Sequence, residues 1–333
     1  MVDRTDTPIA QDLLQRTIQL ERIFMPNARA RRDALYDGQK PARFVHYTSA
    51  EAALNIIRTK RVWMRNTTCM SDYMEVEHGF QLLNRFFHEE RKRAQFTGAL
   101  DACHAGVGTE AIGLFNQWWN DIKLNTYVTS LSEHMDTEDT HGRLSMWRAF
   151  GGNTARVALV FNVPWFTGAQ TALNISFSPV TYPTADDVEA EIASVIKNVR
   201  ENASFLHAAD RQLLLNYTFH MLVTGVTCLK HEGFKEEREW RVIHAPNRAP
   251  SSLMEVATET VGGIPQIVYK IPFDKRASNA LAGLDFEAIF DKVIIGPSQY
   301  PWAISQAFVG ELTAAGIQDA ATRVNVSGIP IRA

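Results

Sequence analysis

Segments that resemble short strands and segments that resemble helices follow one another along this chain without regular alternation. Strands are predicted at residues 43–47, 62–64, 126–132, 157–163, 239–244, 266–273, 292–295 and 323–326. Helices are predicted at residues 9–25, 50–57, from 72 onward, around 118–119, and at 186–206, 209–224 and 302–315. A doubly wound sheet requires strands and helices that alternate regularly along the chain. The observed order therefore favours an α+β fold with a mixed central sheet, or sheets, split by helices.

The composition is that of a globular protein, because 45% of the 333 residues are hydrophobic and 21% are charged. A net charge of −3 argues against a protein that wraps nucleic acid by bulk charge. The three cysteines form no CxxC pair, which is typical of a reducing compartment. The apolar stretches are shorter than a membrane span, and the first residues lack the apolar core of a signal peptide. We expect a cytoplasmic protein with no membrane partner.

The N-terminal part of the chain differs in character from the rest. Apolar residues at helical spacing predict an amphipathic helix at 9–25, and a basic, then polar stretch follows up to Pro41. We expect residues 1–41 to form this helix and a linker, and residues 42–333 to form one elaborated α+β domain of catalytic type. The apolar face of the helix is expected to dock on the body of the protein or on a partner.

The segment from residue 236 to residue 243 has a strand-like pattern that is rich in charge. Alternate residues of a strand share a face, so Glu237, Glu239 and Arg241 are expected on one side. Two carboxylates on one face repel each other unless Arg241, a solvent-filled cleft or a cationic ligand offsets them. Such pairs are common in active sites, but an edge strand whose charges face water explains the same pattern.

Three further segments carry candidate binding residues. His46-Tyr47-Thr48 ends a predicted strand and leads into a helix, where Thr48 and Glu51 predict a capping box and free amides favour an anion. Ser130 and Ser132 share one face of a later strand, where hydroxyl groups fix a site or bond to neighbouring strands. Trp147 precedes a glycine pair, which is typical of a stacking wall beside a loop or of a buried ring beside a turn. For each segment, packing in the core is the competing interpretation.

Familiar catalytic motifs are absent from the sequence, which contains no Walker loop, GxGxxG, HExxH or GxSxG. Cys228 and His231 lack the tight paired spacing of a metal site. We therefore expect no metal.

Taken together, the ordered landmarks resemble DUF2971, a bacterial protein family of unknown function. They are His46-Tyr47-Thr48, Ser71-Asp72 with Glu75, Ser130-Leu131-Ser132, Met146-Trp147 with Gly151, Phe234 with Glu237, Glu239, Trp240 and Arg241, and Val293-Ile294-Ile295-Gly296. The resemblance spans roughly residues 43–315. Ser71-Asp72-Tyr73 departs from the Asn-Asp-Pro expected there, which weakens any catalytic role of Asp72.

The same order is similar to the ADP-ribosyltransferase fold, in which a first-strand His or Arg precedes a Ser/Thr-x-Ser motif and a late Glu-x-Glu. This resemblance implies an ADP-ribosyltransferase-like core that takes NAD as its substrate. It assigns Glu239 to the nicotinamide ribose and to the oxocarbenium-like transition state, and Glu237 to the acceptor as general base. The residues that it implies for binding NAD are His46, Tyr47, Thr48, Ser130, Ser132, Trp147 and Arg241.

Within that implied set, His46 is expected to bond the adenosine ribose and Thr48 to face the diphosphate. Tyr47 or Trp147 is expected to stack on the nicotinamide. Ser130 and Ser132 are expected to brace Glu239. Arg241 is expected to hold a phosphate or to lower the pKa of Glu237.

Three functions remain open at this stage. The first is an NAD-dependent mono-ADP-ribosyltransferase or NAD glycohydrolase, which the resemblance links to bacterial toxins and phage-defence effectors and whose acceptor is a protein or a nucleic acid. The second is a non-catalytic nucleotide-binding sensor. The third is a nuclease or hydrolase that holds a divalent cation with Asp72, Glu75, Glu237 and Glu239.

Overall fold

The computed structural model describes residues 8–37, 40–70, 75–149, 155–165 and 167–330, and it divides the chain into two compact units. The helical unit comprises Met1–Leu35, Ser71–Leu124 and Pro179–Phe234, and the sheet unit comprises Tyr36–Met70, Asn125–Ser178 and Lys235–Ala333. Each unit is assembled from three separate stretches of sequence. This division differs from the expected boundary after residue 41.

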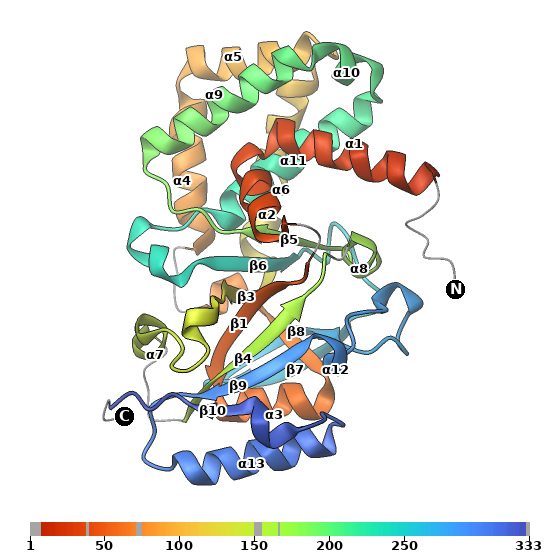
Figure 1. Cartoon of the computed structure of the whole chain (residues 1–333). Helices are drawn as coiled ribbons and strands as arrows, with labels where there is room; N and C mark the ends of the chain where they lie inside the picture. The colour runs from red at the N-terminus through yellow and green to blue at the C-terminus, as the bar shows by residue number, and fades with distance from the viewer. Residues whose placement is uncertain (1–7, 38–39, 71–74, 150–154, 166, 331–333) are drawn as a thin grey trace. The chain divides into compact units, whose positions relative to one another are not determined.

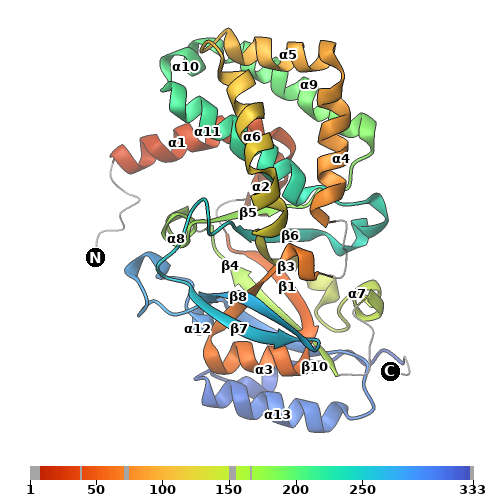
Figure 2. The same cartoon turned by 180° about the vertical axis from the view of Figure 1, so that it is seen from behind.

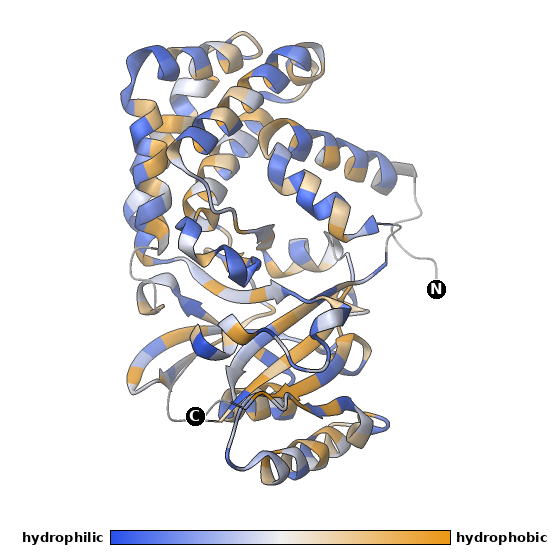
Figure 3. Ribbon diagram, turned by 60° about the vertical axis from the view of Figure 1, so that its left-hand side comes forward, coloured by the Kyte–Doolittle hydropathy of each residue, from blue (hydrophilic) through white to orange (hydrophobic). Residues whose placement is uncertain are grey.

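The helical unit is a bundle in which helices such as α4 and α9 carry hydrophobic residues on one side and hydrophilic residues on the other. Figure 3 shows the hydropathy of each residue on the ribbon. Its helices are α1 (Pro8–Phe24), α2 (Pro26–Leu35), α4 (Glu75–His88), α5 (Glu90–Asp101), α6 (Val107–Leu124), α9 (Ala185–Glu201), α10 (Ala203–Ala208) and α11 (Arg211–Cys228) (Figures 1 and 2). The predicted helix at 9–25 is α1, and it buries Leu20, Ile23 and Phe24 in the core of the bundle.

The segment expected to be a basic linker forms the helix α2 instead. Arg29 and Arg32 donate to the Glu21 carboxylate of α1 at 3.0 and 2.7 Å. The backbone N–H of Asn27 donates to Glu191 of α9 at 3.2 Å. The arginines thus close the corner between α1 and α2, a contact between neighbouring helices that their local spacing does not reveal.

The sheet unit contains a mixed sheet of ten strands among the residues described. Its strands are β1 (Ala42–Ser49), β2 (Arg61–Asn66), β3 (Tyr127–Glu133), β4 (Arg156–Val163), β5 (Ile175–Pro179), β6 (Glu239–His244), β7 (Glu255–Val261), β8 (Ile264–Pro272), β9 (Phe290–Ile295) and β10 (Val324–Val326). Its helices are α3 (Ala50–Thr59), α7 (Leu144–Ala149), α8 (Thr167–Leu173), α12 (Phe286–Ile289) and α13 (Pro301–Ala314). Short 3₁₀ turns lie at Thr67–Cys69, Asp136–Glu138, Glu232–Glu237, Asn279–Leu281 and Ala320–Arg323. The expectation of a mixed α and β fold is confirmed.

The sheet branches at β3. β6 pairs along one edge of β3 from Tyr127 to Ser132, while the other edge pairs with β2 at Tyr127–Val128 and with β1 at Ser132–Glu133. One branch continues through β4, β9 and β10, and the other continues through β8 to β7 (Figure 1). β1 and β2 therefore separate along the middle of β3. The Ser130 carbonyl in that stretch accepts a hydrogen bond from a side chain, His46, at 2.9 Å.

Two further findings concern the helices. α3 packs on β1, β2 and β4, and α13 packs on α3 and β9. Within the described part of the chain, every helix is too short or too polar to cross a membrane.

Candidate functional site

A buried polar cluster on two of the predicted site strands joins Glu239, Ser130 and Arg241. The Ser130 hydroxyl donates to Glu239 Oε1 at 2.5 Å, and Arg241 Nε donates to the same oxygen at 2.8 Å. Arg241 Nη2 donates to Glu239 Oε2 at 3.2 Å. The side chains of Arg241 and Glu239 are only 0% and 4% exposed, so this is a buried ion pair on adjacent positions of one strand face.

The second predicted carboxylate, Glu237, precedes the strand, which corrects the expectation of two carboxylates on one strand face. Glu237 ends a 3₁₀ turn, and β6 begins only at Glu239. Arg238 between them takes a left-handed conformation with φ 45°, which interrupts the alternation on which the prediction depended. The Glu237 main-chain carbonyl accepts from Arg143 at 3.0 Å.

The strand register divides the remaining candidates between two faces of the sheet. Val45 stands opposite Ser132, and Ser132 stands opposite Glu239, so these three side chains share a face. By alternation, Ser130, Arg241 and Tyr47 lie on that same face, whereas His46 and Thr48 lie on the other. His46 and Glu239 therefore face opposite sides of the sheet, although the resemblance assigns both of them to NAD. The register between β1 and β3, which no local motif encodes, is the physical reason.

His46 lines an apolar cavity of about 60 Å³ on its own face of the sheet. The other lining side chains are apolar except Thr129, and they include Val62, Leu131, Phe161, Val242 and Ile271. Burial lowers the pKa of His46, and the hydrogen bond to the Ser130 carbonyl opposes this effect. A neutral imidazole that donates from Nδ1 is the form that suits such a site.

Tyr47 and Trp147 belong to the core. Their rings pack edge to face with centroids 4.9 Å apart, and they are 6% and 5% exposed. The Tyr47 hydroxyl accepts from the Arg143 backbone N–H at 2.8 Å, and the Trp147 indole donates to the His141 carbonyl at 2.8 Å. Burial raises the pKa of Tyr47 to about 12. These contacts support the core interpretation of both rings over that of an open stacking surface.

The predicted capping box is also corrected. The strand β1 does lead into α3 as expected, but Ser49 is the N-cap, and its hydroxyl accepts from the Ala52 backbone N–H at 3.1 Å. Thr48 still belongs to the strand, where it pairs with Val157. The cap is therefore one residue later than the sequence pattern indicated.

Asp72 and the glycine pair after Trp147 lie outside the described residues, and Glu75 is the first residue of α4 in the helical unit. Among the residues that the structure describes, no group of three or more His, Cys, Asp or Glu side chains is arranged to hold a metal ion.

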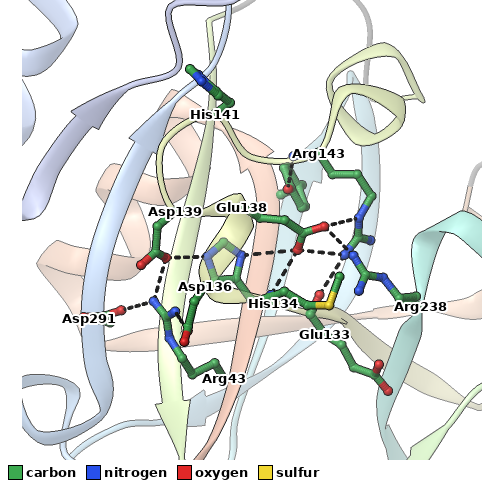
Figure 4. A network of polar contacts seen from close by, with 12 residues as sticks. Arg43, Glu133, His134, Asp136, Glu138, Asp139, His141, Arg143, Arg238 and Asp291 are labelled. Atoms are coloured by element: carbon green, nitrogen blue, oxygen red, sulfur yellow. Dashed lines mark hydrogen bonds and ion pairs between the residues drawn. The ribbon is translucent and has the colours of Figure 1, made fainter.

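Sequence reasoning missed a dense polar network around the loop that follows β3 (Figure 4). Arg43 donates to Asp136 at 2.5 Å, to Asp139 at 2.7 Å and to Asp291 at 2.5 Å. His134 lies against Asp139 at 2.8 Å. The network also contains Glu133, Glu138, Arg143 and Arg238. Most of its members lie between Glu133 and Arg143, but Arg43, Arg238 and Asp291 come from distant parts of the sequence, so no spacing signal could have joined them to the loop.

Comparison with known families gives one match. The DUF2971 family model, described as a protein of unknown function, matches residues 146–242. The match supports the resemblance to this family. It includes Trp147, Glu237, Glu239 and Arg241, whereas His46 and Ser130 lie outside it. Searches of curated proteins and of solved structures gave no significant match.

Proposed function

We propose that the Glu239 cluster is the reaction centre of an NAD-consuming enzyme with an ADP-ribosyltransferase-like core, an ADP-ribosyltransferase or an NAD glycohydrolase. The observation that carries the proposal is the 2.5 Å hydrogen bond from Ser130 to Glu239. It joins the Ser-x-Ser strand to the late glutamate, which are the two elements that the ADP-ribosyltransferase resemblance pairs. The proposal rests on this geometry together with an analogy at the level of the fold.

The chemistry requires one well-placed carboxylate. The bond between the ribose C1′ and the nicotinamide nitrogen breaks, and its electron pair leaves with nicotinamide. A lone pair of the acceptor, or of water, forms the new bond to C1′, and the acceptor's proton passes to solvent or to a base. The carboxylate of Glu239 stabilises the cationic ribose between these events and binds its 2′-hydroxyl.

The structure removes two of the residue roles that the sequence resemblance implied. Glu237 precedes the strand, and His46 lies on the opposite face, so neither is given a role at the Glu239 centre. Glu239 is also nearly buried, so the ribose must gain access to the carboxylate during the reaction.

One observation favours a second candidate function, a nucleotide-binding sensor without turnover. Arg241 already balances the charge of Glu239 within the protein, and both side chains are buried. A carboxylate bound in this way is typical of a structural ion pair as well as of a restrained catalytic group.

The test is nicotinamide release from NAD by the full-length protein, with and without EDTA. We expect slow release that survives EDTA. Glu239→Asp keeps the charge beside Arg241 but withdraws the carboxylate, and it should lower release by about 10²-fold. Glu237→Gln is the matched comparison, because it removes the neighbouring carboxylate outside the strand, and it should retain release.

Each other result has a distinct meaning. Saturable NAD binding without release favours the sensor. Release of nicotinamide that Glu239→Asp does not affect, in a variant with a native circular dichroism spectrum, contradicts the assignment of Glu239. Absence of both binding and release contradicts the proposal as a whole.

A further inference from the structure

The guanidinium of Arg143 connects two stretches of backbone, at the end of β3 and just before β6. Its Nη1 donates to the main-chain carbonyls of Glu236 and Glu237 at 2.8 and 3.0 Å. Its Nη2 donates to the Glu133 carbonyl at 2.8 Å, at the end of β3. Its Nε donates to the Glu138 carboxylate at 3.0 Å. One side chain therefore fixes the end of β3 relative to the two residues that precede Arg238.

The next links lead directly to Glu239. Arg238 has its left-handed backbone here, and its guanidinium binds the same Glu138 carboxylate. The Arg238 carbonyl accepts from the Glu133 backbone N–H at 3.0 Å, and the Trp240 indole donates to the Glu133 carboxylate at 2.7 Å. Glu133 thus holds both neighbours of Glu239, namely Arg238 and Trp240. The carbonyl of Glu133 in turn binds Arg143.

The arrangement depends on the shape of arginine. A planar guanidinium presents five N–H donors in a rigid fork, whereas a lysine ammonium is a point charge with three donors on a flexible chain. The Arg143 side chain is only 11% exposed, so water does not readily replace its contacts with three main-chain carbonyls. Its backbone N–H also donates to the Tyr47 hydroxyl, which joins the same residue to β1.

We propose that Arg143 is a positioning residue for Glu239: it sets the point at which β6 begins and so the place of the Glu239 carboxylate beside Ser130. The inference deepens the proposed function, on which its kinetic part rests. Its structural part concerns only the backbone from residue 236 to residue 241 and is measured without NAD.

Arg43 provides a matched control. Its guanidinium binds the same loop through Asp136 and Asp139, and it binds Asp291 of β9 instead of the segment before β6. Arg43→Ala therefore loosens the loop without removing a bond to residues 236–238. A general effect of loop mobility would make the Arg43 and Arg143 variants behave alike.

The experiment is hydrogen–deuterium exchange on full-length wild type, Arg143→Lys, Arg143→Gln and Arg43→Ala, each checked for native circular dichroism. In both Arg143 variants, exchange of the amides at residues 238–241 should accelerate about tenfold or more, since bonds from a charged donor are lost. In Arg43→Ala the increase should be confined to the loop at residues 134–139. Equal exchange at residues 238–241 in wild type and in folded Arg143→Lys would overturn the inference.

Kinetics provide the second readout. In Arg143→Lys, kcat for nicotinamide release should fall by about 10²-fold with little change in the KM for NAD, because a displaced catalytic group affects the chemical step. Unchanged kcat in folded Arg143→Lys also overturns the inference. If wild type neither binds NAD nor releases nicotinamide, the proposed function fails, and the exchange data alone decide whether Arg143 positions Glu239.

Discussion

Ser130 reaches Glu239 diagonally across the β3–β6 pair. Its hydroxyl donates to the carboxylate at 2.5 Å, although Ser132 is the residue that stands opposite Glu239 in the register. Both serines occupy the same face of β3, so the sequence pattern treats them alike. Only the direction of each side chain decides that Ser130, and not Ser132, donates the hydrogen bond to Glu239.

The two serines therefore differ in their expected contribution to stability. Ser130→Ala removes a hydrogen bond to a buried carboxylate and should lower the free energy of unfolding by about 1.5–3 kcal/mol. Ser132→Ala, the matched control on the same face, should cost less than about 1 kcal/mol, since a small buried hydroxyl is replaced by a methyl group. Urea denaturation of both variants measures the difference. Equal losses would contradict the distinct role of Ser130.

The buried ion pair makes a second prediction about stability. Arg241→Met leaves the Glu239 carboxylate buried without its guanidinium and should destabilise the protein by about 3–5 kcal/mol. The double variant Glu239→Gln/Arg241→Met removes both charges and should regain most of that loss. Thermal and urea unfolding of the single and double variants test the coupling. A double variant as unstable as Arg241→Met would show that charge burial is not the cause.

Close packing around Trp147 leads to a third prediction. A Cβ added at Gly296 would lie 2.8 Å from Trp147 Cε3 and 3.1 Å from the Arg156 carbonyl oxygen. Gly296→Ala should therefore destabilise the protein by about 1–3 kcal/mol through overpacking. Gly310→Ala is the control, because a Cβ at that position in α13 has open space around it, and it should stabilise the helix by about 0.5–1 kcal/mol. Melting temperatures that move in the same direction for both variants would contradict this account.

The buried His46 gives a prediction about pH. Its pKa in the folded protein is lowered by burial, so below about pH 6.5 the unfolded chain binds more protons than the folded protein does. Its contribution to stability is therefore present above pH 6.5 and is lost as the pH falls toward the lowered value. The slope reaches at most about 1.4 kcal/mol per pH unit for one group.

His46→Gln should flatten this dependence, because an amide can donate to the Ser130 carbonyl but does not titrate. Urea unfolding of wild type and variant at pH 8 and pH 5.5 gives the comparison. His134 and His244, whose pKa values burial also lowers, keep part of the slope in the variant. An identical slope in wild type and His46→Gln would rule out this role of the ring.

Local periodicity predicted many of the elements, because it reports the side on which each segment is buried. The segment from 239 to 244 became β6 with those bounds, and the helix predicted at 9–25 became α1. The helix predicted at 186–206 is divided at Asn202, whose amide donates back to the carbonyl of Asn198. Such competition by a side chain is not visible in the spacing of apolar residues.

The candidate site was less predictable because it depends on register and on one unusual dihedral angle. Glu239 and Arg241 were placed together correctly, since alternation on one strand is local. The opposite placement of His46 follows from the pairing of β1 with β3, which joins residues far apart in sequence. The exclusion of Glu237 follows from the left-handed backbone of Arg238, a residue type that gives little sign of such a conformation.

The interleaving of the two units also constrains how the chain acquires its structure during synthesis. β1 leaves the ribosome early, but its partners β3 and β4 begin only at Tyr127 and Arg156, after the stretch Ser71–Leu124 of the helical unit. The backbone groups of β1 therefore lack their partner strands while residues of the helical unit are synthesised. Removal of the N-terminal helices would take Leu20, Ile23 and Phe24 from the bundle core. A shortened chain is thus a poor substitute for the whole protein, and dependence on chaperones is the behaviour to expect of nascent or truncated forms.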